Sequence, residues 1–150
     1  MKYYNVDDVD LKGKRVLVRI DINSPVKNGK LIGIERIQEH SVTIKELIKK
    51  RAKIVLLSYQ GRRGNPDFIS LKEHAQWLKK FCRHDILFVE DIAGKKAVHA
   101  IQNLRDGEVL LLENVRILKE EEEKTKKKVL VKTLAPLFDY FIFDAFSVAH

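Results

Sequence analysis

The chain has 150 residues, of which 45% are hydrophobic and 33% are charged, and its formal net charge at pH 7 is +8. This length and composition suit one globular α/β domain with a buried core, and they argue against intrinsic disorder. No apolar run approaches the roughly 20 residues of a membrane helix, and the charged segment 1–14 has no apolar stretch of the kind found in secretory signals.

Short apolar runs rich in β-branched residues alternate along the chain with segments whose apolar residues recur every three or four positions. In chain order, the expected elements are a strand over 16–20, a helix over 36–50, a strand over 53–57, a helix that starts at the capping box Ser70-Leu71-Lys72-Glu73, a strand over 86–89, a helix around 98–104, a strand over 109–112, a helix over 130–137 and a strand over 140–143. This strict alternation predicts a three-layer α/β/α, Rossmann-like domain whose parallel sheet has about five to six strands.

Polar residues follow four of the expected strands. Asp21 and Asn23 come directly after the first strand, and Pro25 then prevents further strand pairing because it has no N–H to donate. Similar polar stretches follow the strands that end at positions 57, 112 and 143. Asp and Asn are common turn formers, so this pair alone is more typical of an ordinary turn. Four such ends in one parallel sheet, however, predict a lined cleft at its carboxyl edge, where small ligands bind.

The four polar stretches resemble, in order, the motifs of the N-terminal half of the phosphoglycerate kinases. The segment 18–25 reads Val-Arg-Ile-Asp-Ile-Asn-Ser-Pro, like the family's VR-x-D-x-N-x-P, and 110–116 carries the complete LLLENVR motif. The segment 58–63 matches the family's SHLGRP loop in part, and 144–150 is similar to its DAFGTAH motif. The resemblance covers essentially the whole chain. It implies that residues 1–150 form a nearly complete substrate-binding domain, cut slightly short at its C-terminal end, without the C-terminal nucleotide-binding domain.

The resemblance also implies roles for the polar residues at these strand ends. Arg36, which opens the first long helix, matches the arginine that neutralises the phosphoryl group in transfer, and it is the expected catalytic residue. Arginine suits this chemistry because its planar guanidinium grips phosphate or carboxylate with two parallel hydrogen bonds. Arg62 and Arg116 match the arginines that hold the 3-phosphate of the substrate. Asp21 and Asn23 match the residues at its hydroxyl and carboxylate end.

The loop after the second strand departs from the family motif in two places. Tyr59 stands where the family usually has a phosphate-contacting histidine, and it keeps a hydrogen-bond donor without a positive charge. Arg63 replaces a proline, which makes the loop more flexible and more cationic. In the last motif, Ser147 and Val148 replace Gly and Thr. The expected substrate-binding residues are Asp21, Asn23, Arg36, Tyr59, Arg62 and Arg116, and no metal ligand is expected.

Phosphoglycerate kinases transfer a phosphoryl group between 1,3-bisphosphoglycerate and ADP in glycolysis and gluconeogenesis, so the resemblance implies the acceptor half of a phosphotransferase. The chain has neither a G-x-x-x-x-G-K-[ST] nor a G-x-G-x-x-G motif. This agrees with the family, in which ATP or ADP and magnesium bind the other domain. We therefore expect no cofactor in this chain and no kinase activity from it alone. Its expected partners are 3-phosphoglycerate or 1,3-bisphosphoglycerate and the C-terminal nucleotide-binding domain.

The residues by themselves leave open a non-catalytic α/β module that binds an anion or a partner chain. Nucleic acid is not an expected partner, although the chain is basic. The lysines are spread along the chain, and the densest run, 124–128, directly follows the acidic run 120–123, as in a solvated helix. No aromatic residues interleave a basic stripe. The positive charge therefore favours a small anionic ligand.

The cysteine and the histidines suggest no chemistry of their own. Cys82 is the only cysteine, which favours a reducing, cytoplasmic location, and its place on the apolar face of the second helix predicts a core residue. The remaining candidates show no metal-ligand spacing and are interpreted as surface residues; they are His40, His74, His84 and His99. His150 is interpreted as a terminal residue without a fixed role.

Overall fold

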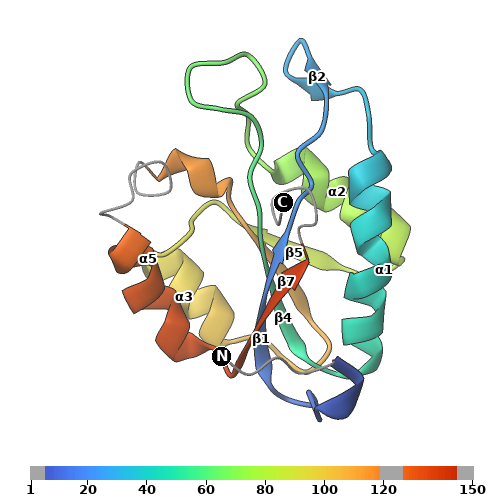
Figure 1. Ribbon diagram of the computed structural model, residues 1–150, viewed down its shortest axis with the longest axis vertical. Coiled ribbons are helices and arrows are strands. Elements are labelled where there is room, and N and C mark those ends of the chain that lie inside the picture. The colour runs from blue at the N-terminus through green and yellow to red at the C-terminus, as the bar shows by residue number, and fades with distance from the viewer. Residues whose placement is uncertain (1–5, 119–126, 145–150) are drawn as a thin grey trace.

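The computed structural model of the chain describes residues 6–118 and 127–144 (Figure 1). Its centre is a five-stranded sheet in which every neighbouring pair is parallel, in the order β5-β6-β4-β1-β7. The strands are β1 (Arg15–Ile20), β4 (Lys53–Leu57), β5 (Ile86–Val89), β6 (Val109–Leu112) and β7 (Tyr140–Asp144). All five match the predicted runs within one residue at either end, so the parallel sheet predicted from the sequence is confirmed.

Helices cover both faces of the sheet, which makes the domain three-layered (Figure 1). The helices α1 (Glu35–Lys49) and α2 (Lys72–Cys82) pack on one face, and α3 (Lys95–Gln102) and α5 (Lys127–Leu134) pack on the other. The two faces arise because successive strand residues point to opposite sides. Val16 and Val18 of β1 therefore join the core under α1 and α2, whereas Leu17 between them joins the core under α3 and α5. The Rossmann-like architecture is thus confirmed.

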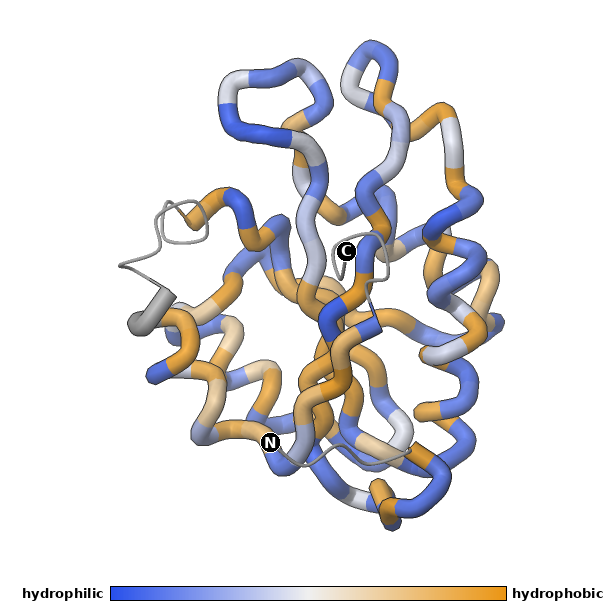
Figure 2. Tube along the Cα trace, viewed as in Figure 1, coloured by the Kyte–Doolittle hydropathy of each residue, from blue (hydrophilic) through white to orange (hydrophobic). Residues whose placement is uncertain are grey.

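Burial on both faces explains why β6, and β4 after Lys53, are continuously apolar rather than apolar at alternate positions. Figure 2 shows this as hydrophobic colour along the central strands, with hydrophilic colour on the outer turns of the helices and on the loops. Each fully buried Ile or Leu contributes about 1.5–3 kcal/mol to folding. None of the helices in the described parts of the chain is long and apolar enough to cross a membrane. The predicted inner face of α2 is buried, and it consists of Leu71, Ala75, Leu78 and Cys82.

Because the strands are parallel, their carboxyl ends meet at one edge of the sheet, the upper edge in Figure 1. The chain after β1 rises above this edge and forms a hairpin of two short strands, β2 (Val26–Lys27) and β3 (Lys30–Leu31). The sequence reasoning did not predict this hairpin, because two residues per strand are too few to show an alternating pattern. The loop between β4 and α2 rises beside the hairpin, and the segments that follow β1 and β4 are in contact through Asn23 and Gly61.

Two interpretations of the sequence are wrong in detail. The capping box at the start of α2 does not form, since the carboxylate of Glu73 accepts a hydrogen bond from the backbone N–H of Leu31 at 3.0 Å instead of returning to Ser70. The histidines are not all surface residues either. His74 is fully buried and His40 is largely buried. Polar groups from other segments of the chain contact both ring nitrogens of His40 and Nε2 of His74.

Candidate functional site

The loop after β1 holds a carboxylate against the first turn of α1. Asp21 is only 2% exposed, and its Oδ2 lies 3.0 Å from Nη1 of Arg36, the second residue of α1. Its Oδ1 accepts the backbone N–H of Asn23 at 3.1 Å, which closes the tight turn that the Asp-x-Asn sequence favours. The Arg36 side chain is 48% exposed, so the guanidinium is oriented by a buried acid while much of it stays accessible to a ligand.

Two cavities adjoin Arg36 at the carboxyl edge of the sheet. One has a volume of about 410 Å³, and it lies between the loop after β1 and the start of α1. Its lining residues include Asn23, Ser24, Gly33, Arg36 and Asp67. The other has a volume of about 460 Å³, and its lining includes Asp21, Arg36, His40, Thr43 and Asp144. Arg36 is therefore the side chain that the two cavities share.

Gly61, in the loop after β4, is the point at which three of the sequence motifs meet. Its backbone N–H donates to Oδ1 of Asn23 at 2.8 Å, and its carbonyl oxygen accepts a hydrogen bond from the Arg116 guanidinium. Glycine is required here for two reasons. Its φ is +68°, and a Cβ atom would lie 2.5 Å from the backbone of Asp67. The loop therefore joins the first motif to the arginine after β6 through one residue.

Tyr59 forms an aromatic surface beneath the arginines. The Cζ atom of Arg116 lies 3.9 Å from the centroid of the Tyr59 ring, and that of Arg19 lies 6.0 Å away. Both distances fall within the range of cation–π attraction. Arg116 is thus held by a carbonyl oxygen on one side and an aromatic face on another, whereas Arg62 lies on the exposed part of the loop next to Gly61.

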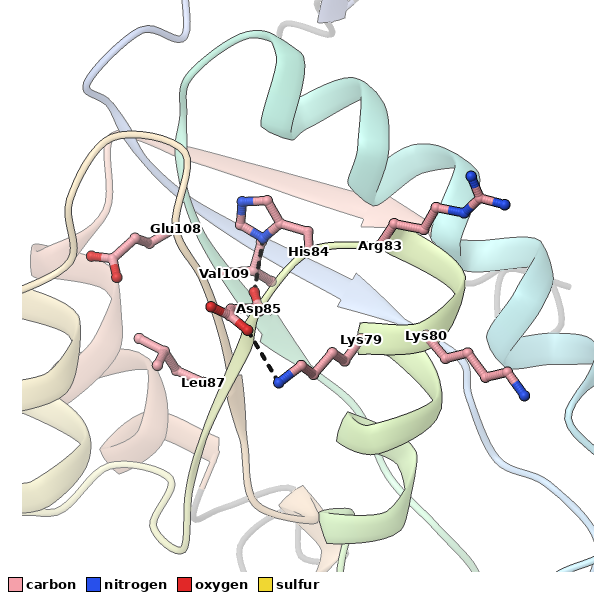
Figure 3. A pocket seen from close by; sticks show the side chains of 8 residues that line it. All are labelled: Lys79, Lys80, Arg83, His84, Asp85, Leu87, Glu108 and Val109. Atoms are coloured by element: carbon pink, nitrogen blue, oxygen red, sulfur yellow. Dashed lines mark hydrogen bonds and ion pairs between the residues drawn. The ribbon is translucent and has the colours of Figure 1, made fainter.

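A larger cavity of about 740 Å³ lies at the opposite edge of the sheet, beside the amino ends of β5 and β6 (Figure 3). Some of the polar and charged groups that line it already have partners within the protein. Lys79 Nζ lies 3.1 Å from Asp85 Oδ1, and His84 Nδ1 lies 2.8 Å from the carbonyl oxygen of Asp85. Lys80 and Arg83 extend away from this pair in Figure 3. Ligands of open α/β sheets bind at the carboxyl ends of the strands, so the smaller cavities at Arg36 are the better candidate site.

The family model for phosphoglycerate kinase matches residues 6–150. The chain belongs to the phosphoglycerate kinase family. It is 51% identical over 152 residues to a phosphoglycerate kinase of Sulfolobus acidocaldarius, in an alignment that covers 97% of this chain and 37% of that protein. It is 44% identical over 156 residues to a phosphoglycerate kinase of Methanothermobacter thermautotrophicus, covering 99% of this chain and 38% of that protein. The chain therefore spans little more than a third of the length of these family members.

Solved phosphoglycerate kinase structures have the same fold over the same stretch. The crystal structure of the enzyme from Pyrococcus horikoshii superposes with a TM-score of 0.93 at 37% identity, and the match covers 99% of this chain and 38% of that one. The structure from Coxiella burnetii superposes with a TM-score of 0.79 at 31% identity, covering 99% and 37% of the two chains. Together with the sequence relatives, these matches identify the chain as an N-terminal fragment of a phosphoglycerate kinase.

Most of the site residues expected from the phosphoglycerate kinase motifs lie together at the carboxyl edge. Asp21 contacts Arg36 directly, and Asn23 is joined to Arg116 through Gly61. Tyr59 lies under Arg116, and Arg62 follows Gly61 in the exposed loop. The segment 145–150, which completes the last motif and includes His150, lies outside the described residues. Within the described ranges, no group of three His, Cys, Asp or Glu side chains is arranged to hold a metal ion.

Sequence reasoning missed Gln60, a fully buried residue that connects the loops of this candidate site. Its Oε1 accepts the backbone N–H of Ser24 at 2.9 Å, and its Nε2 donates to the carbonyl oxygens of Ser24 and Asp67. The same Oε1 lies 2.9 Å from Nε2 of His74. Gln60 lies in the polar stretch 58–64, so its sequence neighbourhood gives no signal of burial. Buried amides are kept only where their hydrogen bonds are met, and here Ser24 and His74 meet them.

Glu113 and Asn114, which directly follow β6, are a second pair of buried polar residues that supports the same loops. Asn114 is fully buried, and its side-chain amide donates to the carbonyl oxygens of Gln60 and Ile69 while its Oδ1 accepts the backbone N–H of Gln60. Glu113 accepts hydrogen bonds from the hydroxyl of Ser70 and the backbone N–H of Leu71. The Glu-Asn dipeptide of the LLLENVR motif therefore organises the loop between β4 and α2, and Arg116 is the residue of this motif that contacts Gly61 and Tyr59.

Burial lowers the pKa of His74 from its ordinary value of 6.5 to about 4. The ring is therefore neutral at physiological pH. Its Nε2–H donates to Oε1 of Gln60, because an amide oxygen can only accept a hydrogen bond. The opposite ring nitrogen, Nδ1, is buried without a hydrogen-bond partner among the described residues. A second proton at Nδ1 would find no acceptor there, which agrees with the lowered pKa.

Proposed function

We propose that this chain is the 3-phosphoglycerate-binding domain of a phosphoglycerate kinase. The whole protein would transfer a phosphoryl group between 1,3-bisphosphoglycerate and ADP, as a glycolytic phosphotransferase of the cytoplasm. The observation that carries the proposal is the pair of oriented arginines at one sheet edge. Arg36 is held by Asp21, and Arg116 is held by Gly61 and Tyr59, with Asn23 between them.

The residues suit the acceptor side of this reaction. Phosphoryl transfer depends on positioning and charge neutralisation more than on covalent help from the protein. In this proposal Arg116 and Arg62 bind the 3-phosphate, because guanidinium groups pair with phosphate oxygens at two points. Asp21 and Asn23 bind the hydroxyl and carboxylate end of glycerate. Arg36, which is half exposed beside both cavities, neutralises the phosphoryl group as it moves.

The donor nucleotide belongs to the rest of the protein in this proposal. The chain contains no glycine-rich phosphate-binding motif, and it spans only 37% of a family member such as that of S. acidocaldarius. Magnesium with ATP or ADP would bind the C-terminal domain, and closure of the two domains would exclude water and bring donor to acceptor. Residues 1–150 alone are therefore expected to bind the acceptor weakly and to have no kinase activity.

Calorimetric titration of the full-length protein with 3-phosphoglycerate tests the proposal. We expect saturable binding that Arg116→Ala weakens by about tenfold or more, because one charge-assisted contact is lost. Arg83→Ala is the matched control, since Arg83 is an exposed arginine at the opposite edge of the sheet, and it should bind like the wild type. Equal affinity for 3-phosphoglycerate and inorganic phosphate would contradict the proposal and favour a general anion-binding module.

A further inference from the structure

His40 connects the last strand of the sheet to the loop that holds Arg36. It lies in the second turn of α1, and its side chain is only 12% exposed. Its Nδ1 lies 3.0 Å from Oδ2 of Asp144, the last residue of β7, whose side chain is 16% exposed. Its Nε2 lies 3.4 Å from the backbone nitrogen of Asp21. One imidazole ring thus bridges two segments that are far apart in the sequence.

These two contacts determine the tautomer of the ring. A backbone N–H can only donate, so Nε2 of His40 must carry a lone pair and accept from Asp21. The ring proton is then on Nδ1, where it donates to the Asp144 carboxylate. Both ring nitrogens are used within the protein, and neither is available as a general acid or base. His40 therefore has the chemistry of a side chain that orients its neighbours.

The contacts continue from His40 to the exposed guanidinium. Nε2 of His40 accepts a hydrogen bond from the backbone N–H of Asp21, and the carboxylate of Asp21 holds Arg36. Asp144 is itself held in the sheet, because it pairs in register with Ile20 of β1. All four polar groups line one cavity of about 460 Å³. A shift of the ring would therefore move the Asp21 turn and, with it, the ion pair that orients Arg36.

We propose that His40 is a positioning residue for Arg36, held in its Nδ1–H tautomer by Asp144. The proposal rests on the proposed function, because it assigns to Arg36 a role in the turnover of that site. It differs from a purely structural role of His40 in one respect. A structural histidine would alter stability without a selective effect on turnover, whereas a positioning histidine alters the rate of the chemical step even in a folded protein.

The ring tautomer gives the first test, and it is independent of activity. The protein as its gene encodes it is labelled with ¹⁵N-histidine, and long-range proton–nitrogen correlations are recorded at about pH 7.5, where a histidine can be neutral or charged. We expect the His40 proton on Nδ1 and an unprotonated Nε2. A proton on Nε2, or on both nitrogens, would overturn the proposal. Asp144→Ala should release this preference if the assigned contact is the cause.

Steady-state kinetics give the second test. His40→Leu removes both contacts, His40→Asn can still donate near the Nδ1 position, and His40→Gln can still accept near the Nε2 position. We expect His40→Leu to lower kcat by about ten- to a hundredfold, because small misplacements of a catalytic group are costly. KM for 3-phosphoglycerate should change by less than about threefold. His40→Gln should recover more of kcat than His40→Asn, because the contact to Asp21 is the one that leads to Arg36.

A matched substitution separates this effect from the general loss of a histidine. His99 is exposed on α3, so His99→Leu should leave kcat and the melting temperature unchanged. Unchanged kcat in His40→Leu, or equal recovery by the Gln and Asn variants, would overturn the proposal. Residues 1–150 alone are expected to have no phosphoglycerate kinase turnover, but if the intact two-domain protein has none, the proposed function fails. In that case a proton on Nε2 of His40 overturns the contact scheme as well, and a proton on Nδ1 supports it.

Discussion

Acid should destabilise this chain through His74 before it protonates the carboxylates of the surface. In the folded protein the pKa of His74 is about 4, against 6.5 for an unperturbed histidine, because burial desolvates the ring. Between these two values the unfolded chain binds a proton at His74 and the folded chain does not, so stability falls as the pH is lowered. The pKa difference corresponds to about 3 kcal/mol in full, of which about 2 kcal/mol is lost by about pH 5.

Urea unfolding, followed by circular dichroism, measures this loss at about pH 7.5 and about pH 5. His74→Gln is the informative variant, because glutamine can still donate to Gln60 from near the Nε2 position but does not titrate. Other titrating groups are present in both proteins and cancel in the comparison. The wild type should lose about 2 kcal/mol more than the variant over this pH interval. Equal losses in the two proteins would refute the reasoning, since His74 would then not be held neutral in the folded state.

Substitutions at Arg36, Tyr59 and Gly61 test the carboxyl edge of the sheet. Arg36→Lys should lower turnover of the intact kinase by about a hundredfold, because lysine lacks the planar fork, while stability changes by less than about 1 kcal/mol. Normal turnover in this variant would remove Arg36 from the reaction. Tyr59→Phe keeps the ring beneath Arg116 and should bind 3-phosphoglycerate like the wild type, whereas Tyr59→Leu should lose about 1 kcal/mol of affinity in a calorimetric titration. Identical affinities in all three proteins would show that the aromatic face does not matter. Gly61→Ala should cost about 2 kcal/mol or more of folding stability, because a Cβ atom meets backbone at 2.5 Å. Gly64→Ala has a similar positive φ but open space around it, and it should cost only about 1–2 kcal/mol; equal costs would contradict the steric argument.

The sheet, and the edge at which the polar motifs gather, could be predicted because they depend on local patterns. Runs such as 54–57 and 109–112 are apolar throughout, which only a strand buried on both faces requires, and the structure places both in the interior of the sheet. Parallel strands bring their carboxyl ends to one edge, so Asp21, Asn23 and Arg116 had to lie near one another once the sheet was parallel. Residue type and position along the chain were sufficient for these conclusions.

The sequence by itself therefore determined the fold class, the family and the edge of the sheet at which the polar motifs gather. Only the tertiary structure decided which polar groups are buried and what satisfies them. His40 meets Asp144 across 104 positions, Gln60 meets Asn114 across 54, and Ser70 meets Glu113 across 43. A period of two or of three to four residues describes how one element faces its surroundings, and it carries no information about a partner so far away. A histidine or glutamine in a polar-looking segment consequently resembles a surface residue until the packing of several segments encloses it.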